Sequence, residues 1–93
     1  MPTFMTRVEL HQASGSDYTQ LHSAMHNAGF ASTIRSDDGK THHLPTAEYY
    51  YFGSVALTQV RDKAASAAGT TGRAFAVLVT EGERFAWQGL LSA

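Results

Sequence analysis

Four consecutive aromatic residues, Tyr49–Phe52, follow the carboxylate of Glu48 in the middle of the chain. Flat rings with few charges nearby suit a pleated strand that packs against neighbours on both faces. Because successive side chains of a strand point to opposite sides, Tyr49 and Tyr51 share one face. The stretch Thr46–Phe52 therefore predicts a central strand of a sheet.

The segments on either side of this stretch alternate between strand and helix patterns. Apolar and polar side chains alternate at the N-terminal end, as in a half-buried strand. In order, we expect a strand at Thr3–His11, a helix from Ser14 or Ser16 to about Ala28, short strands at Ser32–Ile34 and Thr41–Leu44 joined by the turn Asp37-Asp38-Gly39, the aromatic strand after a break at Pro45, a helix from Ser54 to about Ala68, and a strand at Ala74–Thr80.

This order, βαββαβ, is that of the ferredoxin-like sandwich, an α+β fold in which two helices cover one face of an antiparallel sheet. The chain of 93 residues is long enough for one such domain, residues 1–93. The segment Phe85–Leu91 also has strand-like composition. We expect it to add a further strand, either to the chain's own sheet or to that of a partner.

Composition limits the partners that the chain can have. Charged residues make up 16% of it, below the usual quarter, and such a sparsely charged surface favours a homodimer. The net charge of −1 gives no overall attraction to nucleic acid or anionic lipid, so an RNA contact must be local. The chain has no cysteine, no export leader and no apolar run of membrane-spanning length, so we expect a cytoplasmic protein without membrane contact.

The first strand carries the clearest candidate for chemistry. Its alternation places Arg7, Glu9 and His11 together on the face that looks away from the helices. Glu9 and His11 are about 7 Å apart along the strand, which suits a general acid and base on either side of a substrate. Arg7 beside them could hold a phosphate. The alternative is that Arg7 and Glu9 are charges of a solvated face with only a structural role.

A second polar cluster lies at the predicted hairpin, where Arg35 precedes Asp37 and Asp38. These side chains could position a phosphodiester or a divalent cation, although Asp-Asp-Gly is equally explained as a turn. His42 and His43 follow on a strand and point to opposite faces, so one of them should face the open side of the sheet. We expect Arg7, Arg35 and His42 to be the residues that contact RNA.

No metal or cofactor site is predicted. His22 and His26 have the spacing that brings two imidazoles to one metal on a helix, but the usual glutamate between them and a third ligand are missing. They are more simply explained as partly exposed helix residues. No glycine-rich phosphate loop or nucleophile elbow is present. The tyrosines lack the glycine-flanked pattern of RNA-recognition modules, and packing in a core or dimer explains them better.

Several segments resemble the GhoS antitoxin family of small bacterial proteins: Pro2–His11, Gly29-Phe30, Ile34–Gly39 and Leu44–Tyr49. That family is similar in fold to the VapD ribonucleases and to small CRISPR-associated nucleases. The resemblance implies a ferredoxin-like domain, dimerisation, and an endoribonuclease that silences the message of a membrane toxin.

Two hypotheses of different classes follow. The first is a GhoS-like, metal-independent and sequence-selective endoribonuclease or RNA-binding antitoxin, in which Glu9 and His11 are catalytic. The second is a non-catalytic dimeric interaction protein, such as a phage- or plasmid-borne regulator or inhibitor. Under the second hypothesis alanine substitutions at Tyr50, Phe85 or Trp87 abolish function, whereas those at Glu9 and His11 are silent.

Overall fold

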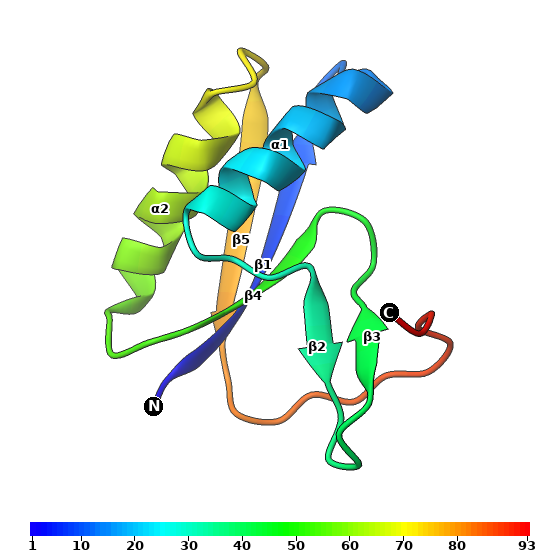
Figure 1. Ribbon diagram of the computed structural model, residues 1–93. Coiled ribbons are helices and arrows are strands. Elements are labelled where there is room, and N and C mark those ends of the chain that lie inside the picture. The colour runs from blue at the N-terminus through cyan, green and yellow to red at the C-terminus, as the bar shows by residue number, and fades with distance from the viewer.

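A computed structural model describes all residues 1–93, and in it two helices lie on one side of a three-stranded antiparallel sheet (Figure 1). The α+β class predicted from the sequence is therefore confirmed. Neither helix has the length and apolar character needed to cross a lipid bilayer. The elements are β1 (Thr3–Leu10), α1 (Gly15–Asn27), β2 (Thr33–Arg35), β3 (Thr41–His43), β4 (Glu48–Phe52), α2 (Leu57–Gly69) and β5 (Phe75–Glu81).

The central strand of the sheet is β1, which pairs with β4 on one side and β5 on the other. The prediction that the aromatic strand is central was therefore wrong, because β4 lies at one end of the three-stranded sheet. Beyond β4 there is only an isolated bridge, in which Ala31 and Tyr50 exchange two backbone hydrogen bonds of 2.8 Å. This bridge stands where the predicted sheet has a fourth strand.

The residues expected to supply that fourth strand instead pair with each other. β2 and β3 form a separate two-stranded sheet, with Ile34 opposite His42. Their turn is tight: the backbone N–H of Ser36 donates to the carbonyl of Lys40 at 2.9 Å, and Gly39 adopts a φ of 85°. The Asp-Asp-Gly turn is thus confirmed, and it directs the chain into a hairpin beside the main sheet (Figure 1).

The segment after β5, Gly82–Ala93, forms no strand, so the expected strand at Phe85–Leu91 is absent. We call this segment the tail. It runs past the hairpin and ends beside β3 (Figure 1). There the N–H of His43 donates to the carbonyl of Leu91 at 2.8 Å, and the N–H of Ala93 donates to the carbonyl of Thr41 at 3.0 Å. The far end of the tail therefore closes onto the hairpin, whereas only its first residue, Gly82, hydrogen-bonds to β1.

The core lies between the sheet and the helices. Alternate residues of β1 from Phe4 to Leu10 are buried, and both helices contribute to the same cluster. Its largest fully buried members are Tyr49, Phe4, Phe30, Leu21, Met25, Val8 and Val60. Burial of this set holds one face of β1 against the helices, so the other face is directed away from them.

The predicted start of α1 agrees with the structure, but the predicted start of α2 does not. Ser14 caps α1 as predicted, since its hydroxyl accepts from the N–H of Asp17 and the Asp17 carboxylate accepts from the N–H of Ser14. The expected cap at Ser54 was wrong, because α2 begins after Ala56. The side chain of Gln59 accepts from the N–H of Ala56 at 2.7 Å. This contact supplies part of the capping that a serine would have provided.

Tyr49 provides a test of the core. Its ring is 1% exposed, and its hydroxyl makes a hydrogen bond with Nδ1 of His22. Burial, with the nearby Tyr18 hydroxyl adding to it, raises the pKa of Tyr49 to about 12. A group whose pKa is higher in the folded protein than in the unfolded chain stabilises below the unfolded value, and this contribution is lost as the pH rises through the folded value.

We therefore expect Tyr49→Phe to lower the free energy of unfolding by about 1 kcal/mol near neutral pH, through loss of the hydrogen bond. Between about pH 10 and 12 the wild type should lose this advantage. In that range Tyr49 ionises in the unfolded chain but stays neutral in the folded protein, which favours unfolding, and the phenylalanine variant has no such group. Urea unfolding of both proteins at several pH values measures the difference. The same difference at pH 8 and pH 12 would contradict the assignment.

Candidate functional site

The side chains of the sheet that point away from the helices form what we call the open face. From β1 it receives Met5, Arg7 and Glu9, which alternate with the buried residues of that strand. Directly opposite residues of antiparallel strands share a face, so Glu48 of β4 and Leu78 of β5 flank Arg7. The open face thus carries two of the three residues that the sequence singled out, Arg7 and Glu9, and the third, His11, lies just beyond the strand.

Glu9 and His11 are brought together at the end of β1. The distance between His11 Nδ1 and Glu9 Oε1 is 3.9 Å, and the two side chains are 50% and 65% exposed, respectively. β1 ends at Leu10, but the N–H of His11 still donates to the carbonyl of Ala74 at 2.8 Å. The pair is therefore held at the end of the central strand and is open to a substrate from the solvent side.

Arg7 is positioned by a neighbouring strand. Its Nη1 lies 3.2 Å from Oε1 of Glu48, which is directly opposite it in the β1–β4 register. The Arg7 side chain is 62% exposed. Ion pairs this exposed contribute little to stability, because water and salt screen them. Glu48 thus orients the guanidinium on the open face while leaving it available to a phosphate.

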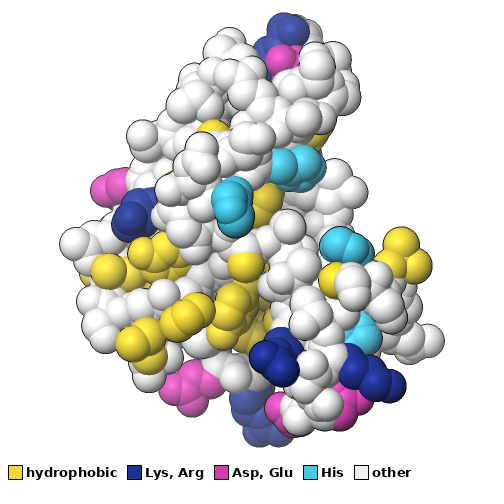
Figure 2. All heavy atoms as spheres, in the orientation of Figure 1, with side chains coloured by type: hydrophobic (Ala, Val, Ile, Leu, Met, Phe, Trp, Pro, Cys, Tyr) yellow, Lys and Arg dark blue, Asp and Glu magenta, His cyan; other side chains and the backbone are white.

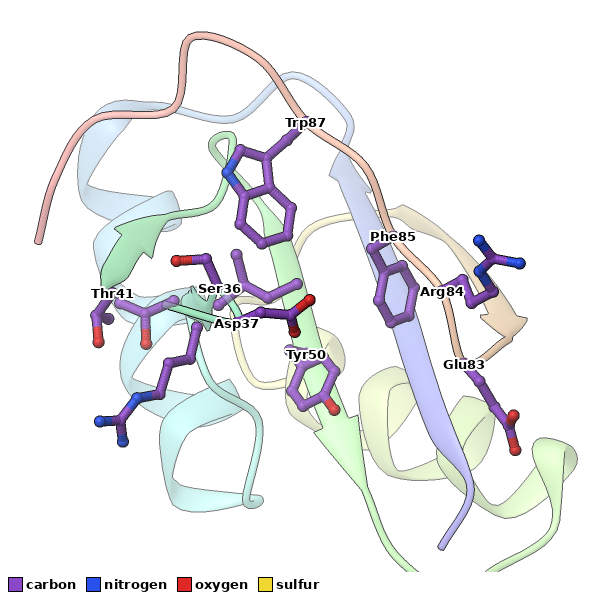
Figure 3. Close-up of a pocket in the computed structure, with 11 residues that line it drawn as sticks. Ser36, Asp37, Thr41, Tyr50, Glu83, Arg84, Phe85 and Trp87 are labelled. Carbon is purple, nitrogen blue, oxygen red and sulfur yellow. The ribbon is translucent and has the colours of Figure 1, made fainter. Parts of the chain in front are cut away.

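Arg35 lies in a different place, a cleft of about 740 Å³ between the hairpin and the tail. In Figure 3 this cleft is in front of the sheet and the helices are behind it. Six residues that line it matter for the site: Arg35, Asp37, Tyr50, Arg84, Phe85 and Trp87. The structure therefore separates Arg35 from Glu9 and His11, which do not line this cleft.

The two aspartates of the hairpin have different roles. A hydrogen bond from the Ser36 hydroxyl, with one from the backbone N–H of Lys40, lowers the pKa of Asp38. Asp38 is therefore engaged in holding the turn. Asp37 makes no such contact and lines the cleft. Arg35 is also fixed by the turn, because its Nε donates to the carbonyl of Gly39 at 3.1 Å.

His42 packs against one of the aromatic rings that line the cleft. Its ring centroid is 5.7 Å from that of Trp87, and its buried Nδ1 has no hydrogen-bond partner. The next residue of β3, His43, is exposed. Of the predicted RNA contacts, Arg7 lies on the open face, Arg35 lines the cleft, and His42 supports an aromatic ring of that cleft.

The sequence predicted Tyr50 in the aromatic strand, Phe85 and Trp87 in a further strand, and all three in a protein interface under the second hypothesis. It did not predict that their rings would meet. Their rings come from β4 and from the tail, and Tyr50 packs edge-on against Phe85 with a centroid distance of 6.0 Å. The alternation of Phe85 and Trp87 was visible as a strand signal. It could not show that the tail would bring both rings to the hairpin.

The helix histidines take no part in this site. His22 is bonded to the Tyr49 hydroxyl. No group of three or more His, Cys, Asp or Glu side chains lies close enough together to hold a metal ion. Both His22 and His26 are exposed on α1.

The exposed position of Arg7 leads to a stability prediction. We expect Arg7→Ala to change the free energy of unfolding by less than about 1 kcal/mol, because the pair with Glu48 is solvated. Met25→Ala in the core serves as the comparison and should cost about 2–5 kcal/mol. Urea unfolding of the two variants measures both values. A loss for Arg7→Ala as large as for Met25→Ala would show that Arg7 has a structural role instead.

Comparison with known proteins addresses the class of chemistry. No curated protein matches the chain. The family model described as Endoribonuclease GhoS matches residues 1–86, which leaves only the last part of the tail outside the match. Nearly all of the 93 residues are thus covered, including β1, the hairpin, both helices and Phe85. The chain therefore belongs to the GhoS endoribonuclease family.

Proposed function

We propose that this protein is a GhoS-like antitoxin that cleaves RNA on the open face of its sheet, with Glu9 and His11 as the catalytic acid–base pair. Membership of an endoribonuclease family supports the class of reaction. The observation that carries the assignment to residues is the exposed Glu9–His11 pair, 3.9 Å apart on the same strand as Arg7. The resemblance to the family implies that the target is the message of a membrane toxin.

The proposed chemistry uses the 2′-hydroxyl group of RNA as the nucleophile. The Glu9 carboxylate accepts the proton of this hydroxyl, and the oxygen attacks the adjacent phosphorus. The protonated imidazole of His11 donates a proton to the departing 5′-oxygen. One P–O bond forms and one breaks, so the products are a 2′,3′-cyclic phosphate and a free 5′-hydroxyl. No redox step or external nucleophile is required.

Arg7 would stabilise the transition state. It lies two residues before Glu9 on the same side of β1, about 7 Å away along the strand. Negative charge builds on the phosphate oxygens as the 2′-oxygen attacks, and a guanidinium fixed nearby stabilises this charge without having to reorganise. In this proposal the phosphate displaces Glu48 from Arg7, at small cost because that pair is exposed.

The ferredoxin-like arrangement is part of the same proposal. The order β4-β1-β5, continued past β4 by the Ala31–Tyr50 bridge, supports it. In such a sandwich the helices cover one face and leave the other free for a ligand. In this proposal RNA is the partner, and the open face is the surface that binds it. Sequence selectivity requires contacts to bases, and the half-buried rings beside the open face could provide them.

A cleavage assay tests the function. Wild type, His11→Ala and Glu9→Gln are incubated with single-stranded and hairpin RNAs, with magnesium or with EDTA. We expect wild type to cut in both conditions and to leave 2′,3′-cyclic phosphate ends, and each variant to be slower by about 100-fold or more. His26→Ala is the matched control, because this exposed histidine lies on α1 at the other side of the molecule.

Two outcomes would contradict the assignment. If folded His11→Ala cuts as fast as wild type, the acid–base pair is elsewhere. If EDTA abolishes cleavage by wild type, a divalent cation takes part and the proposed transfer of protons is incomplete.

The second candidate function, a non-catalytic dimeric interaction protein, has its own support in the structure. Leu78 lies beside Arg7 on the open face and is 66% exposed, and Phe52 on the same face is 63% exposed. Figure 2 shows that hydrophobic side chains also gather around the loop between β4 and α2, where Leu57 is 42% exposed. Large exposed apolar side chains are typical of a surface that another subunit covers.

Under this alternative we expect a homodimer that buries the open face, and Leu78→Lys should dissociate it into monomers. Light scattering with size-exclusion chromatography measures the mass. Ser66→Lys, at an exposed polar position of α2, is the matched control and should leave the mass unchanged. A wild-type protein that is monomeric at high concentration would exclude this alternative, whereas a stable dimer sensitive to Leu78→Lys would leave no room for RNA at Glu9 and His11.

A further inference from the structure

We propose that the cleft between the hairpin and the tail is a subsite for one unpaired base of RNA, with guanine preferred. This inference rests on the proposed function, since it supplies the base contact that selective cleavage requires. The cleft is formed by parts of the chain that are far apart in sequence: β2 and its turn, Tyr50 of β4, and the tail. Figure 3 shows Trp87, Phe85 and Tyr50 around its opening.

The aromatic rings suit a flat ligand. Tyr50 and Phe85 pack edge to face at 81°, so their planes are fixed relative to each other, and Trp87 packs against the His42 ring. All three rings are half-buried. They therefore keep exposed surface towards the cleft while their orientation is set by neighbours. Unpaired bases of RNA are commonly bound by stacking on such rings.

The two arginines of the cleft differ from the other arginines of the chain in having no carboxylate partner. Of the five arginines in the chain, Arg7, Arg61 and Arg73 are in ion pairs. The two that remain, Arg35 and Arg84, both line this cleft, and neither has a carboxylate within 4.0 Å. Guanidinium groups without a carboxylate partner at an aromatic cleft are suited to the phosphates on either side of a stacked base.

Asp37 gives the cleft its preference among bases. In Figure 3 its carboxylate points between Trp87 and Tyr50, whereas Glu83 and Arg84 lie on the side of Phe85 away from it. An ionised carboxylate only accepts hydrogen bonds and has two oxygens for doing so. The Watson–Crick edge of guanine presents two adjacent N–H donors. Adenine and cytosine present one donor group beside acceptors, and uracil presents one N–H between two carbonyl oxygens. These bases therefore match the carboxylate less well.

The position of the cleft relative to Glu9 fits this role. Tyr50 is directly opposite Met5 in the β1–β4 register, and Glu9 lies four residues farther along β1, about 14 Å away. Arg7 stands between them on the same face. A few nucleotides of single-stranded RNA can span this path. A base held in the cleft would then determine which phosphodiester lies at Glu9 and His11.

Trp87 is the only tryptophan of the chain, so intrinsic fluorescence reports directly on the cleft. The experiment titrates the full-length protein with the 5′-monophosphates of guanosine, adenosine, cytidine and uridine, excited where they do not absorb. We expect saturable quenching, tightest with the guanosine nucleotide. Asp37→Asn should weaken that binding by about tenfold or more and remove the preference. Tyr50→Leu, which keeps apolar packing without a ring, should weaken all four by about tenfold.

Asp62→Asn on α2 is the matched control and should bind as wild type does. Quenching that does not saturate, or that is equal for all four nucleotides and unchanged in Asp37→Asn, would overturn the proposal. The monophosphates contain no phosphodiester bond, so their binding does not depend on cleavage. A protein that binds the guanosine nucleotide but leaves RNA intact contradicts the proposed function alone. A protein that cuts RNA without binding any nucleotide contradicts this subsite alone.

Discussion

The pairing of β1 with strands on both sides is the constraint on which the rest of the structure depends. With β4 and β5 at its edges, every side chain of β1 is assigned to one of two faces. Phe4, Val8 and Leu10 enter the core, and Arg7 and Glu9 are left on the open face. A shift of one residue in this register would bury the charges and expose the core. The same packing that stabilises the fold therefore also presents the candidate catalytic residues.

Local patterns predicted what depends on local structure. Alternation in β1 predicted the faces correctly, and the serine cap of α1 and the turn at Asp38 and Gly39 follow from short-range hydrogen bonds. The pairing of strands was not predictable in this way, because it depends on contacts between distant segments. β2 and β3 hydrogen-bond to each other, so they do not have to join the main sheet. The side of β4 that faces away from β1 is left with a single bridge.

One part of the candidate site could be predicted from local sequence patterns, and the other part could not. Glu9 and His11 are close in sequence, so their proximity could be inferred from strand geometry alone. The cleft could not be inferred, because Arg35, Tyr50 and Trp87 come from three separate elements. Phe85 and Trp87 had the alternation of a strand, yet the tail hydrogen-bonds to β3 only near its end. Its rings pack instead on Tyr50 and His42, which no local rule describes.

The distribution of positive charge connects the two parts of the site. A net charge of −1 gives RNA no long-range attraction, so binding has to come from local groups. Arg61 and Arg73 are neutralised by neighbouring carboxylates away from the open face. Arg35 and Arg84 have no such partners, and Arg7 has an exposed one. With so few phosphate contacts available, electrostatics cannot supply most of the affinity. In the proposed complex with RNA, stacking and hydrogen bonds to a base must then contribute a large share of the affinity, so the proposed binding would be selective.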